Sequence, residues 1–235
     1  MAMTVQGIYQ AVRLCYDEEA QNGSELAAGF TAASAGDTAL MNHIIKAKLG
    51  DALRWICLYA PAEQLSGGGS VEAGSINIVE DVVQQSVPED GRISLGGNFI
   101  RLIRVRCSNW HRAVMGESLL KEDSDEYLQL MDAYGATATT DRPQAALIET
   151  AVKQVEVWPH VSGAKYDLTK LVMPSTSDLS NLGDGDTVNI PPLLQTSFLY
   201  YLAFLVLSAY EDSRAPRMLE IAKMNLGLTD DKQRA

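Results

Sequence analysis

The sequence of 235 residues predicts an α+β protein, with a helical bundle formed by both ends of the chain and a β-rich subdomain inserted between them. Apolar residues recur at three- and four-residue steps near the N-terminus and again after residue 190. Between residues 76 and 173 the pattern changes to short β-rich runs separated by turn residues. A flexible joint at 66–70, with glycines at 67–69, precedes the β-rich runs, and a Gly-Asp turn at 183–186 follows them.

These changes of pattern divide the chain into three predicted segments. Residues 1–65 supply the N-terminal helices, residues 66–175 the β-rich subdomain, and residues 176–235 the helices that complete the bundle, followed by a polar tail. A chain of this length buries roughly 70–75% of its unfolded surface, so it needs no disulfide or metal to hold a core.

Two helices are predicted in the N-terminal segment. The first spans about residues 4–20, where Val5, Ile8 and Val12 recur at helical spacing. The second spans about residues 37–60, with Asp37 as its N-cap. Its apolar side is expected to comprise Leu40, Ile44, Ala47, Leu49, Leu53, Ile56 and Cys57, and its polar side His43, Lys46, Lys48, Asp51 and Arg54.

The β-rich segment begins its clearest strands after a strong turn signal, Pro88-Glu89-Asp90-Gly91. One short helix is expected at 124–134, with Tyr127, Leu128 and Met131 on one side. The predicted strands are residues 92–95, 99–107, 152–158 and 166–173.

The C-terminal segment predicts two helices. Leu193–Tyr210 is almost entirely apolar, and Pro191-Pro192 suits the first helical turn. Eighteen residues at ~1.5 Å each barely span a bilayer, and no basic flank anchors the run, so a fully buried central helix is favoured over a membrane span. The last helix covers 215–226, and Gly227 closes it.

Charge and cysteine usage exclude several functions. Lys and Arg total 19 and Asp and Glu 30, a net charge of −11, which disfavours DNA as a ligand. Cys15, Cys57 and Cys107 are too few and too widely spaced for a disulfide framework or zinc site, and buried reduced thiols are expected. The N-terminus lacks the pattern of a secretory signal.

No catalytic, cofactor-binding or metal-binding residues are predicted. The glycine run lacks the Gly-Lys-Ser/Thr ending of a phosphate loop, and His43, His111 and His160 share no metal-ligand spacing. Four further residues, Asp178, Asn181, Asp184 and Asp186, do not match a calcium loop; an Asx-rich surface turn is expected, and a structural ion between Asp178 and Asp186 is left open.

One basic cluster stands out in the predicted strand at 99–107. Arg104 and Arg106 fall on one face of the strand and Arg101 on the other. Salt bridges, internal or between subunits, are the favoured role for these arginines, and contact with DNA phosphate is the alternative. The acidic positions Asp123, Asp125 and Glu126 fit a solvated face or a helix N-terminus.

Several motifs, in this order, resemble those of the head-to-tail connector (adaptor, ring or head-completion) proteins of tailed bacteriophages, over about residues 37–227. The motifs are Asp90-Gly91-Arg92-Ile93-Ser94-Leu95, Phe99-Ile100-Arg101-Leu102-Ile103-Arg104-Val105, Trp110-His111-Arg112-Ala113-Val114, Arg142-Pro143-Gln144-Ala145, Val155-Glu156-Val157-Trp158-Pro159, Met173-Pro174, Pro191-Pro192-Leu193-Leu194, Tyr200-Tyr201-Leu202-Ala203 and Ala222-Lys223-Met224-Asn225-Leu226.

The resemblance implies a structural role in the neck of a virion. Such proteins form a ring, commonly of twelve copies, beneath the portal; the ring extends the DNA channel and docks the tail. They have no active site or cofactor, and DNA passes without sequence-specific binding. On this reading the protein assembles in the host cytoplasm, contacts portal and tail proteins and no membrane, and meets the portal through Arg214–Ala235.

Two other functions stay open from the sequence. One is a different tail or neck part, such as a stopper or tail-tube subunit. The other is an acidic cytoplasmic enzyme, whose candidate site residues would be His111, Cys107 and Asp186.

Overall fold

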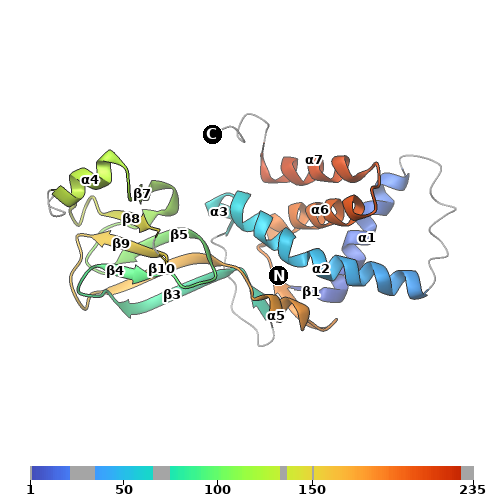
Figure 1. The fold of residues 1–235 in the computed structure, drawn as a ribbon, viewed down its shortest axis with the longest axis horizontal. Helices are drawn as coiled ribbons and strands as arrows, with labels where there is room; N and C mark the ends of the chain where they lie inside the picture. Colours follow the sequence, from blue (N-terminus) through green and yellow to red (C-terminus); the bar gives the residue numbers. More distant parts are fainter. Residues whose placement is uncertain (1, 22–34, 66–74, 133–136, 150, 229–235) are drawn as a thin grey trace. The chain divides into compact units, whose positions relative to one another are not determined.

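The computed structural model describes residues 2–21, 35–65, 75–132, 137–149 and 151–228 (Figure 1). Helices make up 43% and strands 26% of the chain, so the α+β class predicted from the sequence is confirmed. The chain divides into two compact units. Val79–Met173 forms one of them, the β unit, and Met1–Ile78 with Pro174–Ala235 forms the other, the helical unit.

The unit boundaries differ from those expected at residues 65/66 and 175/176. Strand β2 (Ser75–Asn77) pairs in parallel with β11 (Thr187–Asn189), and β11 pairs antiparallel with β1 (Met3–Thr4). This three-stranded sheet places β2 in the helical unit, because its partner β11 and the outer strand β1 both belong to that unit. The predicted glycine joint at 66–70 lies outside the described residues.

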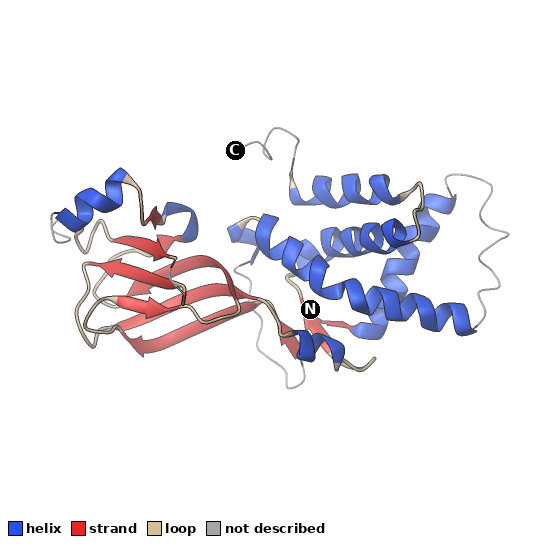
Figure 2. Cartoon of the chain, in the orientation of Figure 1, coloured by secondary structure: helices blue, strands red, loops and turns tan. Residues whose placement is uncertain are grey.

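Helices of the helical unit pack around one central helix, α6 (Figure 2). Helices α1, α2 and α7 all contact it. The helices of this unit are α1 Val5–Gln21, α2 Ala35–Tyr59, α3 Ala62–Leu65, α5 Thr176–Ser180, α6 Pro192–Ala209 and α7 Ala215–Leu226.

The predicted packing of α1 is confirmed, and that of α2 is partly wrong. Val5, Ile8 and Val12 of α1 are buried. Helix α2 begins at Ala35, so Asp37 lies inside its first turn and is not the N-cap. Leu40 is exposed, because it shares a helix face with the polar residues of α2. Exposed Ala47 lies on this face as well. The buried residues of α2 are Ile45, Leu49, Ala52, Leu53, Trp55, Ile56 and Cys57.

Helix α6 is apolar all round but is not fully buried, contrary to the prediction. Only 39% of the Pro192–Ala209 window is buried, and the side chain of Leu193 is 72% exposed. Leu194, Phe198 and Leu202 face the neighbouring helices. Within the described residues, α6 alone is long and apolar enough to cross a membrane, a property that core helices share.

The last helix matches its prediction. Helix α7 ends at Leu226, and Gly227 adopts the left-handed conformation (φ 69°) that an αL cap requires. Its buried face consists of Ala215, Met218, Ala222 and Leu226. The polar tail after residue 228 lies outside the described residues.

The β unit contains two four-stranded sheets. Their strand orders are β3-β10-β5-β6, in which all neighbours are antiparallel, and β4-β9-β8-β7, in which β7 and β8 run parallel. The strands are β3 Val79–Ser86, β4 Arg92–Ser94, β5 Phe99–Cys107, β6 Val114–Met115, β7 Leu120–Lys121, β8 Gln144–Ile148, β9 Gln154–Trp158 and β10 Lys165–Val172.

Residues from both sheets form one core, as in a sandwich. Alternation along β9 is clear: Val155 and Val157 enter this core, while Trp158 belongs to a second cluster on the opposite face. Helix α4 (Asp125–Asp132) covers that second face with Tyr127 and Leu130.

The predicted inner side of the helix at 124–134 was therefore wrong in part. Tyr127 is buried as expected, but Leu128 and Met131 are 52% and 40% exposed. Leu130 takes the inner position, because residues three apart on a helix share a face. The end of this predicted helix, at Tyr134, lies outside the described residues.

Candidate functional site

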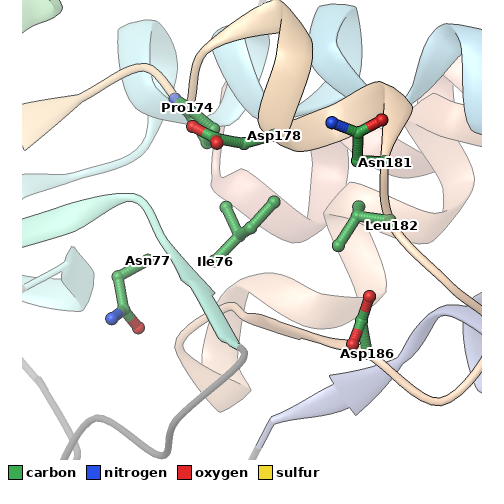
Figure 3. Close-up of a pocket in the computed structure, with 7 residues that line it drawn as sticks. All are labelled: Ile76, Asn77, Pro174, Asp178, Asn181, Leu182 and Asp186. Atoms are coloured by element: carbon green, nitrogen blue, oxygen red, sulfur yellow. The ribbon is translucent and has the colours of Figure 1, made fainter.

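One open hollow lies in the helical unit, with a volume of about 430 Å³ (Figure 3). Carboxylates of Asp178 and Asp186 and amides of Asn77 and Asn181 line it, together with Ile76, Pro174 and Leu182. Three of the four residues singled out as a possible ion site therefore border this hollow.

Three of the four polar side chains of the hollow, those of Asn77, Asp178 and Asp186, have hydrogen-bond partners within the chain. The Ser175 side chain and backbone donate to Asp178 Oδ2, and together they form a capping box at the start of α5. Gly183 N donates to Asp186 Oδ2 at 2.7 Å, and Asn189 Nδ2 donates to Asn77 Oδ1 at 3.1 Å. Asp186 N also donates to Gly183 O at 3.1 Å, so the turn expected at 183–186 is present.

The three candidates for an enzymatic site have different surroundings. The Cys107 thiol is fully buried, and burial raises its pKa to about 12, so it is a poor nucleophile at neutral pH. His111 lies four residues later but is 71% exposed, and its Nδ1 lies 2.5 Å from Asp141 Oδ1. Asp186 belongs to the other unit, and it accepts the hydrogen bond from Gly183.

The other chemistry-bearing residues also serve the fold. Cys15 and Cys57 are buried thiols, as predicted. His43 is exposed on α2, and the ring of His160 lies against Gly91. In the described ranges, no group of three or more His, Cys, Asp or Glu residues could hold a metal ion.

The arginines of β5 face a neighbouring strand. Arg104 Nε donates to Thr169 Oγ1 at 3.1 Å, and that hydroxyl donates to Asp81 Oδ1 at 2.6 Å. Arg106 is the cross-strand partner of Asp167 in the register of β5 and β10. Arg104 and Arg106 are exposed and Arg101 is half-buried. The predicted division between the two faces is wrong, because β5 has an irregularity at Ile103. The cross-strand partners of Arg101, Arg104 and Arg106 are alternate residues on one face of β10: Leu171, Thr169 and Asp167.

One buried carboxylate was not singled out by the sequence. Glu156 of β9 is 6% exposed; Tyr127 Oη donates to its Oε2 at 3.1 Å, and Arg92 Nε lies 3.5 Å from its Oε1. Burial, followed by the Glu156 charge, raises the pKa of Tyr127. The sequence signal for this residue was a glutamate between Val155 and Val157 in a strand pattern. The hydrogen bond between Tyr127 and Glu156 attaches α4 to its sheet.

Apolar side chains are exposed on several helices of the helical unit. Leu14, Leu40, Leu58, Tyr59, Leu193, Tyr210 and Met224 are all exposed. An aromatic row joins α2 to α6: Trp55 stacks on Tyr201 with ring centroids 4.1 Å apart, and Tyr59 and Phe204 extend the row at its ends. Single exposed apolar side chains are ordinary on a protein surface, whereas a contiguous patch of them marks a surface that associates.

No protein-family model matches the chain, and no curated protein matches it in sequence.

Proposed function

We propose that this chain is a structural subunit of a ring, a head-to-tail connector beneath the portal of a tailed-phage virion. In this proposal the helices from both ends of the chain form the framework of the ring, and the β unit is the insertion between them. The ring, of twelve copies by resemblance, extends the DNA channel and docks the tail. The protein performs no chemistry, needs no cofactor and does not enter a membrane.

The observation that carries the proposal is the exposed apolar surface of the helical unit. Leu193 and Met224 are 72% and 73% exposed, and they belong to two different helices, α6 and α7. Contact with a neighbouring subunit would remove these side chains from water, which supports a subunit of an assembly. A closed ring needs two different surfaces that meet between neighbours, and the two units offer such surfaces.

The place in the virion rests on the sequence resemblance. A net charge of −11 is compatible with a channel through which DNA slides, because phosphate gains nothing from an acidic wall. Portal contact is assigned to α7 and the tail, within Arg214–Ala235.

Native mass spectrometry and sedimentation velocity of the purified chain test the assembly. A closed oligomer of defined copy number is expected as concentration rises. A monomer at every concentration, together with electron micrographs of virions that lack this protein at the portal vertex, would contradict the proposal. Its presence elsewhere in the tail would instead favour a stopper or tail-tube subunit.

The portal assignment has a separate test. Deleting residues 228–235 is expected to weaken portal binding and to leave the circular dichroism spectrum unchanged, because α7 and its Gly227 cap are retained. Unchanged portal binding would refute the assignment of the tail. The enzyme alternative is tested by alanine at Cys107, His111 and Asp186, for which no change in phenotype is expected.

A further inference from the structure

The C-terminal half of α2 presents a basic surface with apolar residues. We define the α2 face as Lys48, Arg54, Leu58 and Tyr59. Arg54 is exposed, Leu58 and Tyr59 are 46% and 47% exposed, and the Lys48 side chain is 39% exposed. Asp51 lies 3.9 Å from Lys48 Nζ and supplies the one carboxylate of this stretch, residues 48–59. The face is therefore positive in a chain whose net charge is −11.

Helix α4 of the β unit presents an acidic surface, also with apolar residues. We define the α4 face as Asp125, Leu128, Met131 and Asp132, all exposed. The eight residues of α4 include Asp125, Glu126 and Asp132 and no Lys or Arg.

Two features of α4 are not explained by the stability of its own helix. Asp132 stands at the C-terminal end, where the helix dipole disfavours a carboxylate. Leu128 and Met131 are one turn apart on the outer side, while Tyr127 and Leu130 already fill the contact with the sheet. A partner with a positive charge and apolar side chains would stabilise these residues.

We propose that the α2 face of one copy packs against the α4 face of the next copy. Leu58 and Tyr59 would meet Leu128 and Met131, and Arg54 would meet the carboxylate of Asp132. Tyrosine and methionine suit such a contact, because both are enriched in protein interfaces. This inference rests on the proposed function, since it names the partner surface of each subunit.

Charge selects this pairing over pairing between identical faces. Two α4 faces would bring their carboxylates together, and two α2 faces would bring Arg54 and Lys48 together, so both arrangements are repulsive. When the α2 face of one copy binds the α4 face of the next, one copy of the pair keeps a free α4 face and the other a free α2 face. Further copies can bind there, and repetition of the contact closes a ring or extends a filament.

Charge reversal in the full-length chain tests the pairing. Arg54→Glu and Asp132→Arg are each expected to weaken self-association by about tenfold, measured by sedimentation velocity over a concentration series. The double variant is expected to recover self-association, because the opposite charges are exchanged and restored. The matched controls are Arg112→Glu and Glu89→Arg, two exposed positions outside both faces, which should associate as the wild type does.

The outcomes separate this inference from the proposed function. If the wild type associates and both single reversals associate equally well, the pairing is overturned while the ring stands. If the single reversals weaken association and the double variant does not recover, each face meets some other surface and the pairing is again overturned. A wild type that stays monomeric contradicts the proposed ring itself. Circular dichroism melting curves of every variant separate loss of association from loss of folding.

Discussion

Gly116 occupies a position in the β unit where no side chain fits. It begins the short 3₁₀ turn Gly116–Ser118 after β6, and a Cβ placed there would lie 1.8 Å from the carbonyl oxygen of Leu102 in β5. Because that oxygen belongs to the backbone of a central strand, it cannot move aside as a flexible side chain would. The close approach of the Leu102 backbone, and not a positive φ, therefore explains why residue 116 is a glycine.

Gly116→Ala is expected to destabilise the protein by about 1–3 kcal/mol, the cost typical of overpacking, measured by urea denaturation. Gly97→Ala is the matched control, because a Cβ at Gly97 meets no atom within 4 Å. The control should stay within about 0.5 kcal/mol of the wild type. Equal stability of the two variants would show that β5 and β6 separate readily at this point.

Asp212 fixes the start of α7 through Arg214. Its Oδ1 accepts hydrogen bonds from Arg214 N and Nε, both at 2.9 Å, and its Oδ2 accepts one from Arg214 Nη2 at 2.7 Å. These bonds lower the pKa of Asp212 below its ordinary value. Since the folded pKa lies below the unfolded one, the stabilisation is present above the unfolded pKa, about 4, and is lost as pH falls through the folded pKa.

Asp212→Asn is therefore expected to cost about 1 kcal/mol at neutral pH and progressively less below about pH 4. Thermal melts of the variant and the wild type at several pH values measure the difference. Glu220→Gln serves as the control, because Glu220 forms an exposed pair with Arg217 at 3.5 Å, and such pairs contribute little. A loss that persists undiminished at pH 3 would mean that the carboxylate charge is not the cause.

At the scale of elements, the attachment of α4 depends on a buried polar contact. Tyr127 and Leu130 supply the apolar contact, and the Tyr127 hydroxyl adds its hydrogen bond to Glu156 at 3.1 Å. Tyr127→Phe is expected to destabilise the β unit by about 1 kcal/mol, because Glu156 then loses a donor inside the protein. Tyr210→Phe, at an exposed tyrosine, should change stability little; both are measured by urea denaturation. Identical effects of the two variants would mean that water replaces the lost donor at Glu156.

Elements with a strong period could be predicted from the sequence, and most of the short ones could not; β4, predicted at 92–95 after the turn signal, is the exception. Helices α1, α6 and α7 and strand β5 lie within one or two residues of their predicted ranges, because each carries a long run of one pattern. Strand β8 was missed because Ala145 and Ala146 give no alternating signal, although the two residues enter opposite cores. Strands β1, β2 and β11 have two or three residues each, and only their pairing defines them.

Inner and outer faces were less predictable than the elements themselves. Leu40 and Leu128 are apolar, yet both lie on the outer face of their helices. Hydrophobicity alone places a leucine inside, whereas the position along the helix turn decides its direction. Glu156 shows the opposite error, because a charged residue is expected on the surface and this one is buried. Its burial can be understood only once its partners, Tyr127 and Arg92, are known. Those partners come from other elements, which a local pattern does not reveal.

At the scale of the whole molecule, the β unit is a continuous insertion with adjacent ends. Val79 and Leu171 are direct partners in the antiparallel pair of β3 and β10, so the entering and leaving strands lie about 5 Å apart. All residues of the core between its two sheets lie between Val82 and Leu168 in the sequence, so they come from this unit alone. The helical unit needs both ends of the chain, because α6 packs on α1 and α2.

This arrangement predicts that the insertion can be removed and that each part folds alone. Replacing residues 79–173 by a linker of about five Gly and Ser residues, each reaching up to ~3.5 Å, joins Ile78 to Pro174 without stretching the chain. Circular dichroism of the shortened chain should show a cooperative helical melt, and residues 79–173 alone should give a β-type spectrum with a cooperative urea transition. If the shortened chain is unfolded while residues 79–173 alone are folded, the helices depend on the insertion for their stability. Because the α4 face is absent from the shortened chain, that chain should also fail to form the oligomer expected of the full-length protein.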